Sequence, residues 1–165
     1  MRIHERSIHK FTSALLTLAI LTPIIAWSGP TNIPLKVSLV TQEQVGYTPT
    51  CPSQFGGMLT GTGKSTHMGK VSIAGKDCIT PMENYFTFEG TFELIAANGD
   101  KLTGDYSGSF MPMETPPMYS LSDALLQITG GTGRFSKATG IAKLQGTQNI
   151  QTGKGKMEAS GTISY

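Results

Sequence analysis

The sequence has few charged side chains and few of the residues that commonly carry out chemistry. Charged residues make up only 15% of the 165 residues, which argues against a highly charged disordered chain. His67 is the one histidine beyond residue 28, and no Gly-x-Ser-x-Gly motif is present, so the usual sets for nucleophilic catalysis are missing. No long stretch beyond residue 28 has the apolar period of a helix, which excludes a helical bundle.

The first 28 residues are typical of a secretory signal peptide. Basic residues occur near the start, residues 11–25 are mostly apolar, and Ala26 and Ser28 occupy the −3 and −1 positions of a small-residue cleavage site. The alternative is a membrane anchor, but the apolar run is shorter than the ~20 residues that span a bilayer. We therefore expect a signal helix at 1–28, one domain at 29–165, and a periplasmic or secreted protein.

Cleavage of this segment would leave a chain without net charge, because ten basic and ten acidic residues lie beyond residue 28. No basic patch or run of like charges remains, so we expect no nucleic-acid partner. The sequence predicts no metal site, no cofactor and no stable membrane insertion after cleavage. A homo-oligomer stays open.

Both cysteines, Cys51 and Cys78, lie in the predicted domain. An even number of cysteines in an exported protein favours a disulfide between them. The bond would close a loop of about 28 residues and contribute about 3–4 kcal/mol in the chain-entropy model. Two buried free thiols are the alternative. A metal site is less favoured because neither cysteine belongs to a Cys-x-x-Cys pair.

Apolar and polar residues alternate along the domain, as in strands that bury one face. The alternation is clearest in residues 84–96 and 102–110, and Asn98-Gly99 between them predicts a hairpin with a type I′ turn. Further strands are expected at residues 35–44, 58–66, 68–74, 119–129, 141–150 and 156–165. About eight strands with short turns predict an all-β fold, either a sandwich or a closed antiparallel barrel. Glycines on apolar faces, such as Gly104 and Gly108, favour the barrel because they permit sharp bends.

The most distinctive stretch is glycine-rich and covers residues 128–140. It resembles the G-G-T-G-x-F-x-x-A-x-G signature of the allene oxide cyclase and dirigent barrel superfamily, which bacterial exported proteins also carry. The matching residues are Gly130, Gly131, Thr132, Gly133, Phe135, Ala138 and Gly140. Residues 66–70, Thr-His-Met-Gly-Lys, are similar to a T-H-L-G-K stretch of bacterial members. The resemblance implies a calycin-like barrel of eight strands, with room for an interior pocket and for dimers or trimers, but it carries over no active site.

The glycine-rich motif itself predicts a structural role. Its glycines would end a strand and lead into a short helical turn, so that Phe135 and Ala138 plug one end of the barrel. His67 beside a tight turn is expected to be a structural hydrogen-bonding group, with acid, base or metal ligand as the alternatives. Residues 61–65 end like a phosphate-binding loop, but the required first glycine is absent.

Three functions remain open from the sequence. The first is a non-enzymatic module that is structural or binds a small apolar ligand. The ligand would lie among Phe86, Phe88, Phe92, Tyr106 and Phe110. The second, by resemblance, is an enzyme that guides cyclisation or coupling of a reactive apolar molecule, with Tyr106 as the inward polar group and no catalytic residue assigned. The third is a small outer-membrane barrel, which eight strands and a C-terminal Tyr165 fit but weak aromatic girdles do not.

Methionines gather in the proline-rich segment after residue 110, at Met111, Met113 and Met118. Such flexible side chains are expected to cap the mouth of a barrel. Thioethers also bind Cu(I), but no histidine lies nearby in the sequence to complete such a site.

Overall fold

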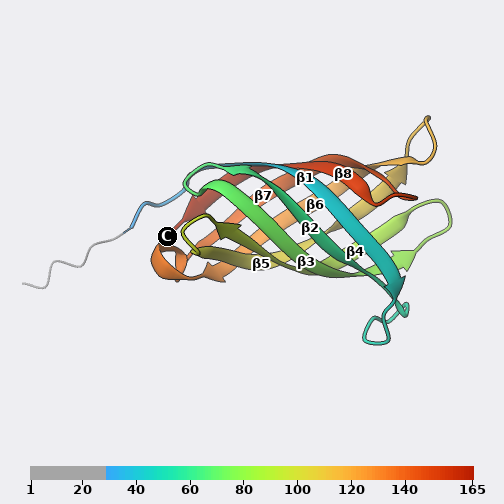
Figure 1. Ribbon diagram of the computed structural model, residues 1–165, viewed down its shortest axis with the longest axis horizontal. Helices are drawn as coiled ribbons and strands as arrows, with labels where there is room; N and C mark the ends of the chain where they lie inside the picture. Colours follow the sequence, from blue (N-terminus) through green and yellow to red (C-terminus); the bar gives the residue numbers. More distant parts are fainter. Residues whose placement is uncertain (1–28) are drawn as a thin grey trace, which may run out of the picture.

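The computed structural model describes residues 29–165, so the predicted signal peptide lies outside the described residues. Eight antiparallel strands form a closed barrel in which sequence neighbours pair and β1 also pairs with β8 (Figure 1). The strands are β1 (Ile33–Tyr47), β2 (Phe55–Ser65), β3 (Gly69–Pro81), β4 (Phe86–Ala96), β5 (Lys101–Pro112), β6 (Met118–Gly131), β7 (Thr139–Asn149) and β8 (Lys154–Ser164). This confirms the expected all-β barrel. Within residues 29–165, no helix is long and apolar enough to cross a membrane.

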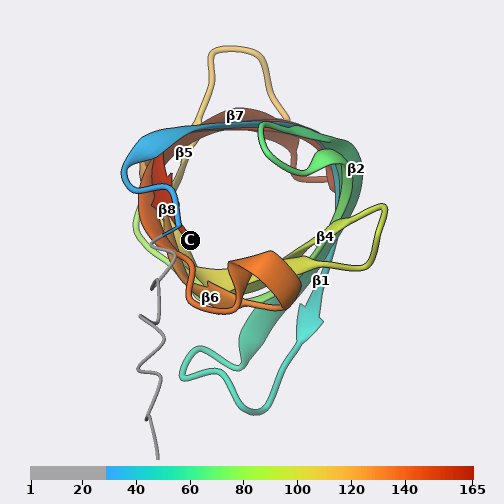
Figure 2. The ribbon, with the colours of Figure 1, turned by 90° about the vertical axis from the view of Figure 1, so that its left-hand side faces the viewer.

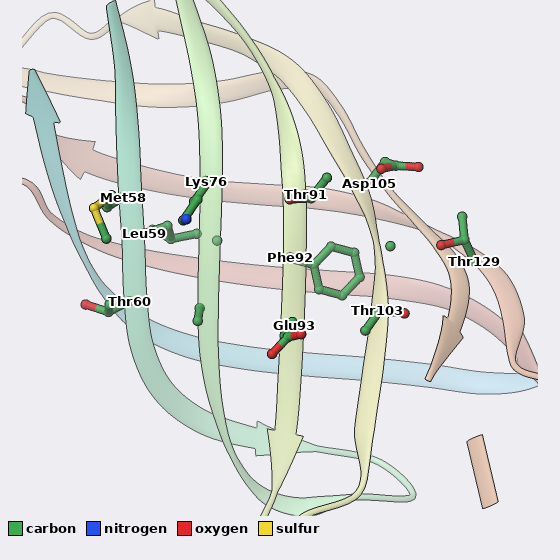
Figure 3. Close-up of a pocket in the computed structure, with 13 residues that line it drawn as sticks. Met58, Leu59, Thr60, Lys76, Thr91, Phe92, Glu93, Thr103, Asp105 and Thr129 are labelled. Carbon is green, nitrogen blue, oxygen red and sulfur yellow. The ribbon is translucent and has the colours of Figure 1, made fainter. Parts of the chain in front are cut away.

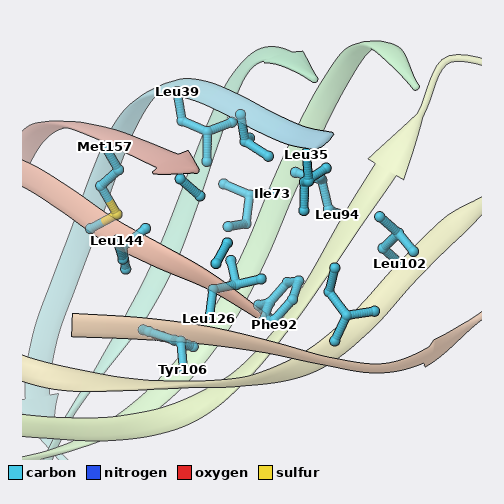
Figure 4. Packing of buried hydrophobic residues seen from close by; sticks show 14 of the residues in the cluster. Leu35, Leu39, Ile73, Phe92, Leu94, Leu102, Tyr106, Leu126, Leu144 and Met157 are labelled. Carbon is cyan, nitrogen blue, oxygen red and sulfur yellow. The ribbon is translucent and has the colours of Figure 1, made fainter. Parts of the chain in front are cut away.

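Alternate residues of every strand face the interior, so the sequence alternation becomes an inner apolar face and an outer polar face. On β1 the buried positions run through Leu35, Val37 and Leu39, while the residues between them are exposed. Side chains from all eight strands meet in one core (Figure 4). All eight predicted strands are present, and the largest extension is in β3, which continues beyond the predicted end at residue 74 to Pro81.

The glycine-rich motif closes one end of the barrel, as expected. After β6, a single 3₁₀ turn, η1 (Gly133–Phe135), crosses the edge of the barrel opening (Figure 2). Phe135 and Ala138 are fully buried, and the Phe135 ring packs against Tyr165 at 4.7 Å. Arg134 donates a hydrogen bond to the backbone carbonyl of His67 and lies over the Phe135 ring, 4.8 Å from its centroid. We call this the closed end.

His67 also has a structural role at the closed end. Its Nε2 lies 2.9 Å from the carbonyl oxygen of Pro34, which links the β2–β3 turn to the start of β1. This contact agrees with the expected structural hydrogen bond. Residues 61–65 lie within strand β2, so they do not form a phosphate-binding loop.

The β4–β5 hairpin is present, but the predicted type I′ turn is wrong. A type I′ turn requires a positive φ at both Asn98 and Gly99. Of these two residues, only Gly99 has one, with φ of 88°. Gly99 N donates to Ala96 O at 3.0 Å, and Ala96 N donates to Asp100 O at 2.9 Å. These bonds define a three-residue loop, a type I turn followed by a left-handed glycine, which Asn-Gly also fits.

The predicted disulfide is present between Cys51 and Cys78, with a Cα–Cα distance of 5.3 Å. It ties the loop between β1 and β2 to β3, directly beside Asp77. Cys51 is buried, whereas Cys78 is half-buried. Disulfides are typical of proteins in oxidising compartments.

We predict that the double substitution Cys51→Ala/Cys78→Ala lowers the free energy of unfolding by about 3–4 kcal/mol, because the unfolded chain regains the entropy of the open loop. Urea denaturation of oxidised wild-type protein and of the variant at one pH measures the difference. Reduced wild-type protein is the matched control and should resemble the variant. An unchanged midpoint in both would contradict a stabilising disulfide.

Candidate functional site

A group of polar side chains lies inside the mostly apolar barrel. Thr41 and Glu43 come from β1, Asp77 from β3, Tyr106 from β5 and Gln148 from β7. Each of the five residues is between 3% and 7% exposed. We call these residues the polar cluster. Burying two carboxyl groups is costly unless they are neutralised or well paired, so the cluster is a candidate functional site.

Strand phase and one glycine bring the two carboxyl groups together. Glu43 continues the inward face of β1, and Asp77 that of β3, while Gly57 of the intervening β2 pairs with Asp77. A Cβ on Gly57 would lie 2.6 Å from Asp77 Oδ1 and closer still to Glu43 Oε1. The two oxygens are therefore within about 5 Å of each other. Any larger residue at position 57 would occupy the space in which the carboxyl groups meet.

The hydrogen bonds of the cluster leave several oxygens without a protein partner. Tyr106 OH donates to Asp77 Oδ2 at 2.7 Å, and Gln148 Nε2 donates to Glu43 Oε2. The buried atoms without a protein hydrogen bond are Thr41 Oγ1, Glu43 Oε1, Asp77 Oδ1 and Gln148 Oε1. No lysine, arginine or histidine is buried within residues 29–165. The cluster thus has an excess of acceptor oxygens and no basic side chain to balance them.

Burial raises the pKa of both carboxyl groups of the cluster. Desolvation, followed by the charge of Asp77, raises the pKa of Glu43 from 4.5 to about 7, although the hydrogen bond from Gln148 lowers it. Desolvation also raises the pKa of Asp77, against the hydrogen bond from Tyr106. A proton on one carboxyl group lets it donate to the other, which gives Glu43 Oε1 and Asp77 Oδ1 a partner. Burial and the Asp77 charge also raise the pKa of Tyr106, which therefore stays protonated.

Four of the five predicted ligand-binding residues lie together around Tyr106, which is also a member of the cluster. Phe88 packs against Phe110 at 4.8 Å and against Tyr106 at 5.7 Å, and Phe92 lies 6.5 Å from Tyr106. These four residues are buried, whereas Phe86 is half-buried. We call the five residues the aromatic group. Tyr106 belongs to both groups and connects them.

Side chains fill most of the interior next to the aromatic group. An apolar cavity of about 20 Å³ is lined by Phe92 and Tyr106 together with aliphatic side chains from β1, β2, β3, β6, β7 and β8. This volume corresponds to about one water molecule. A larger molecule can enter only if side chains move.

The end opposite η1 is rimmed by exposed apolar side chains. Six of the ten large apolar residues that are exposed within residues 29–165 lie there, at strand ends and in loops. They are Val45, Tyr47, Met82, Met111, Met113 and Ile150. We call this end the mouth and these residues the apolar rim. Phe86 packs against Tyr119 at 5.7 Å in the same half of the barrel.

A wider depression of about 580 Å³ lies on the outside of the barrel, across β2, β3, β4 and β5 (Figure 3). Polar side chains such as Lys76, Thr91 and Asp105 line much of it, with Met58 at one side. It includes no residue of the polar cluster. We therefore place the candidate site inside the barrel, where buried polar groups meet aromatic rings.

Sequence reasoning identified Tyr106 and missed the rest of the polar cluster. Asp77 lies in the part of β3 beyond the predicted strand, and Gln148 lies near the end of β7. The signal that could have found Glu43 is the phase of β1, since it shares a face with Leu35 and Leu39. An acidic residue at one of the alternating positions that are otherwise apolar indicates a buried polar group.

A scan against protein-family models and searches of curated proteins and of solved structures found no match. The resemblance to the allene oxide cyclase and dirigent superfamily therefore stays an expectation.

We predict that stability falls as pH rises from 4.5 to 8. Glu43 binds its proton more tightly in the folded barrel, with a pKa of about 7 against 4.5, so its contribution is present below 4.5 and lost as pH passes 7. That shift corresponds to roughly 3 kcal/mol. Urea denaturation of wild type and Glu43→Gln in EDTA-containing buffers measures the difference, which should favour the variant at pH 8. The exposed Glu89→Gln variant should follow wild type. A wild-type protein that gains stability relative to Glu43→Gln at high pH would contradict this assignment.

Proposed function

We propose that the protein is an exported binding module that takes a small, mostly apolar molecule into the mouth half of its barrel. Its location would be the periplasm or the cell exterior, which the disulfide and the signal-like N-terminus support. The observation that carries the proposal is the difference between the two ends. One end is plugged by Phe135, while the other carries the apolar rim and leads to the aromatic group.

The aromatic group would supply most of the binding energy. Buried aromatic rings present large apolar surfaces with few rotatable bonds, so they bind apolar molecules at a small entropic cost. Met111 and Met113 at the rim are flexible and 38% and 40% exposed, which suits a passage that opens and closes. The small volume of the interior cavity means that binding requires aromatic side chains to change rotamer.

The polar cluster would orient the bound molecule. Ligand sites in proteins are mostly apolar and contain a few polar groups that fix orientation. Tyr106 is suited to this role because its ring packs with Phe88 while its hydroxyl is bonded to Asp77. A ligand that reaches Tyr106 would have its apolar body among the aromatic rings and a polar atom at the cluster.

We predict that protein purified from its own exported compartment shows a non-covalent adduct by native mass spectrometry. Phe92→Trp should remove the adduct, because the larger ring fills the cavity that Phe92 lines. Val40→Trp is the matched control, since Val40 is 63% exposed on the outer face and its substitution should leave the adduct in place. Circular dichroism of both variants tests whether they fold. An adduct that persists in Phe92→Trp, or a bare mass in wild type, would argue against an interior ligand.

A second candidate function is an enzyme that directs the reaction of an apolar molecule held in the same place. The observation that favours it is the 2.7 Å bond between Tyr106 and Asp77, which holds a hydroxyl group in a fixed direction inside the barrel. We predict that Tyr106→Phe lowers turnover by at least about 100-fold if the adduct is a substrate, as positioned proton donors typically contribute. Product analysis of the identified adduct measures this. Unchanged turnover would contradict the enzyme and leave binding as the only proposed function.

A further inference from the structure

Four oxygens of the polar cluster have no hydrogen-bond partner in the protein. They are suited to a ligand of a different kind from the apolar molecule that the aromatic group would bind. We propose that the cluster is a binding site for one Ca²⁺ ion, held by Glu43 and Asp77 with Gln148 and Thr41 beside them. This proposal does not rest on the apolar ligand, because it is argued from the acceptor oxygens of the cluster and not from the rings.

The donor set suits a hard cation. All four unpartnered atoms are oxygens: two from carboxyl groups, one from an amide and one from a hydroxyl. Ca²⁺ binds six to eight oxygens of these kinds, including waters, whereas softer metals select nitrogen or sulfur. The carboxyl groups would balance the charge of the ion, and no basic side chain is buried in the described part of the chain to compete for them.

The spacing of the two carboxyl groups also suits one ion. Glu43 Oε1 and Asp77 Oδ1 are within about 5 Å of each other on either side of the space that Gly57 leaves free. Two oxygens that bind the same Ca²⁺ ion at 2.3–2.6 Å lie at most about 5 Å apart. Mg²⁺ requires near-ideal octahedral geometry and shorter distances, so the mixed donors of this cluster favour Ca²⁺.

A shared proton is the competing occupant of the same place. It would provide a partner for the two carboxyl oxygens, but Thr41 Oγ1 and Gln148 Oε1 would remain without one. Gln148 is 4% exposed, and its amide already contacts Glu43, so its oxygen lies at the cluster rather than in solvent. A cation can use the amide and hydroxyl oxygens together with the carboxylates. The proton and the ion would therefore exclude one another.

Calorimetric titration with CaCl₂ at pH 8 tests the site, using protein purified after export and stripped with EDTA. We expect one Ca²⁺ per chain with a Kd of about 0.1–1 mM, the range of extracellular calcium modules. Glu43→Gln/Asp77→Asn should weaken binding at least about 100-fold, because both charged ligands become neutral. Glu89→Gln/Asp105→Asn removes the same charges from the exposed outer face and should leave the affinity unchanged.

Terbium luminescence locates the ion even if the interior double variant fails to fold. Tb³⁺ replaces Ca²⁺ in oxygen sites and emits when a nearby tyrosine is excited. Tyr106 is bonded to Asp77, so wild-type protein should give emission that excess Ca²⁺ removes. Tyr106→Phe should lose most of this emission while it keeps calorimetric Ca²⁺ binding within about 10-fold of wild type, the lower effect of a lost neighbouring group.

Three results would overturn the proposal. They are no Ca²⁺ binding by wild type at millimolar concentration, unchanged binding in a folded Glu43→Gln/Asp77→Asn variant, and full terbium emission from Tyr106→Phe. The first result would assign the carboxyl pair to a shared proton only. None of them bears on the adduct that we expect native mass spectrometry to detect, so the two proposals fail separately.

Discussion

Pairing of β1 with β8 is the constraint on which the rest of the structure depends. Because it closes the sheet, none of the eight strands within residues 29–165 has a free edge, and their alternate side chains must share one interior. An open sheet could leave Glu43 or Asp77 in water by bending away. In a closed barrel their strand phase fixes them inside, whatever the cost of burying a carboxyl group.

The barrel therefore contains two kinds of interior. Towards the closed end, Phe135 and Ala138 complete an apolar core that resembles the inside of many small barrels. Towards the mouth, the polar cluster lies beside the aromatic group, and Tyr106 belongs to both. The fold does not require buried carboxyl groups, since apolar residues of similar size would fill the same space without the free-energy cost of desolvation. Because the carboxyl groups lie in the half of the barrel that carries the apolar rim, we assign the candidate functional site to the mouth half.

Glycine has a part in this arrangement that goes beyond bending the strands. Gly57 lies between the two carboxyl groups, and its missing side chain is the space in which they meet. A shared proton or a cation would lie in this space, next to Asp77, which accepts the hydrogen bond of the Tyr106 hydroxyl, while the Tyr106 ring packs against Phe88. An ion bound there, as we propose, would lie at the hydroxyl of Tyr106 rather than among the aromatic rings.

The sequence by itself determined the strands, the closed end and the disulfide. Alternation of apolar and polar residues is a local property, so all eight strands could be located, and the glycine-rich motif placed Phe135 at one end. The polar cluster was decided by the tertiary structure, because residues 43, 77, 106 and 148 come from four strands and meet only when the barrel closes. Which carboxyl groups face each other depends on register and on Gly57, and no local pattern in a single sequence contains that information.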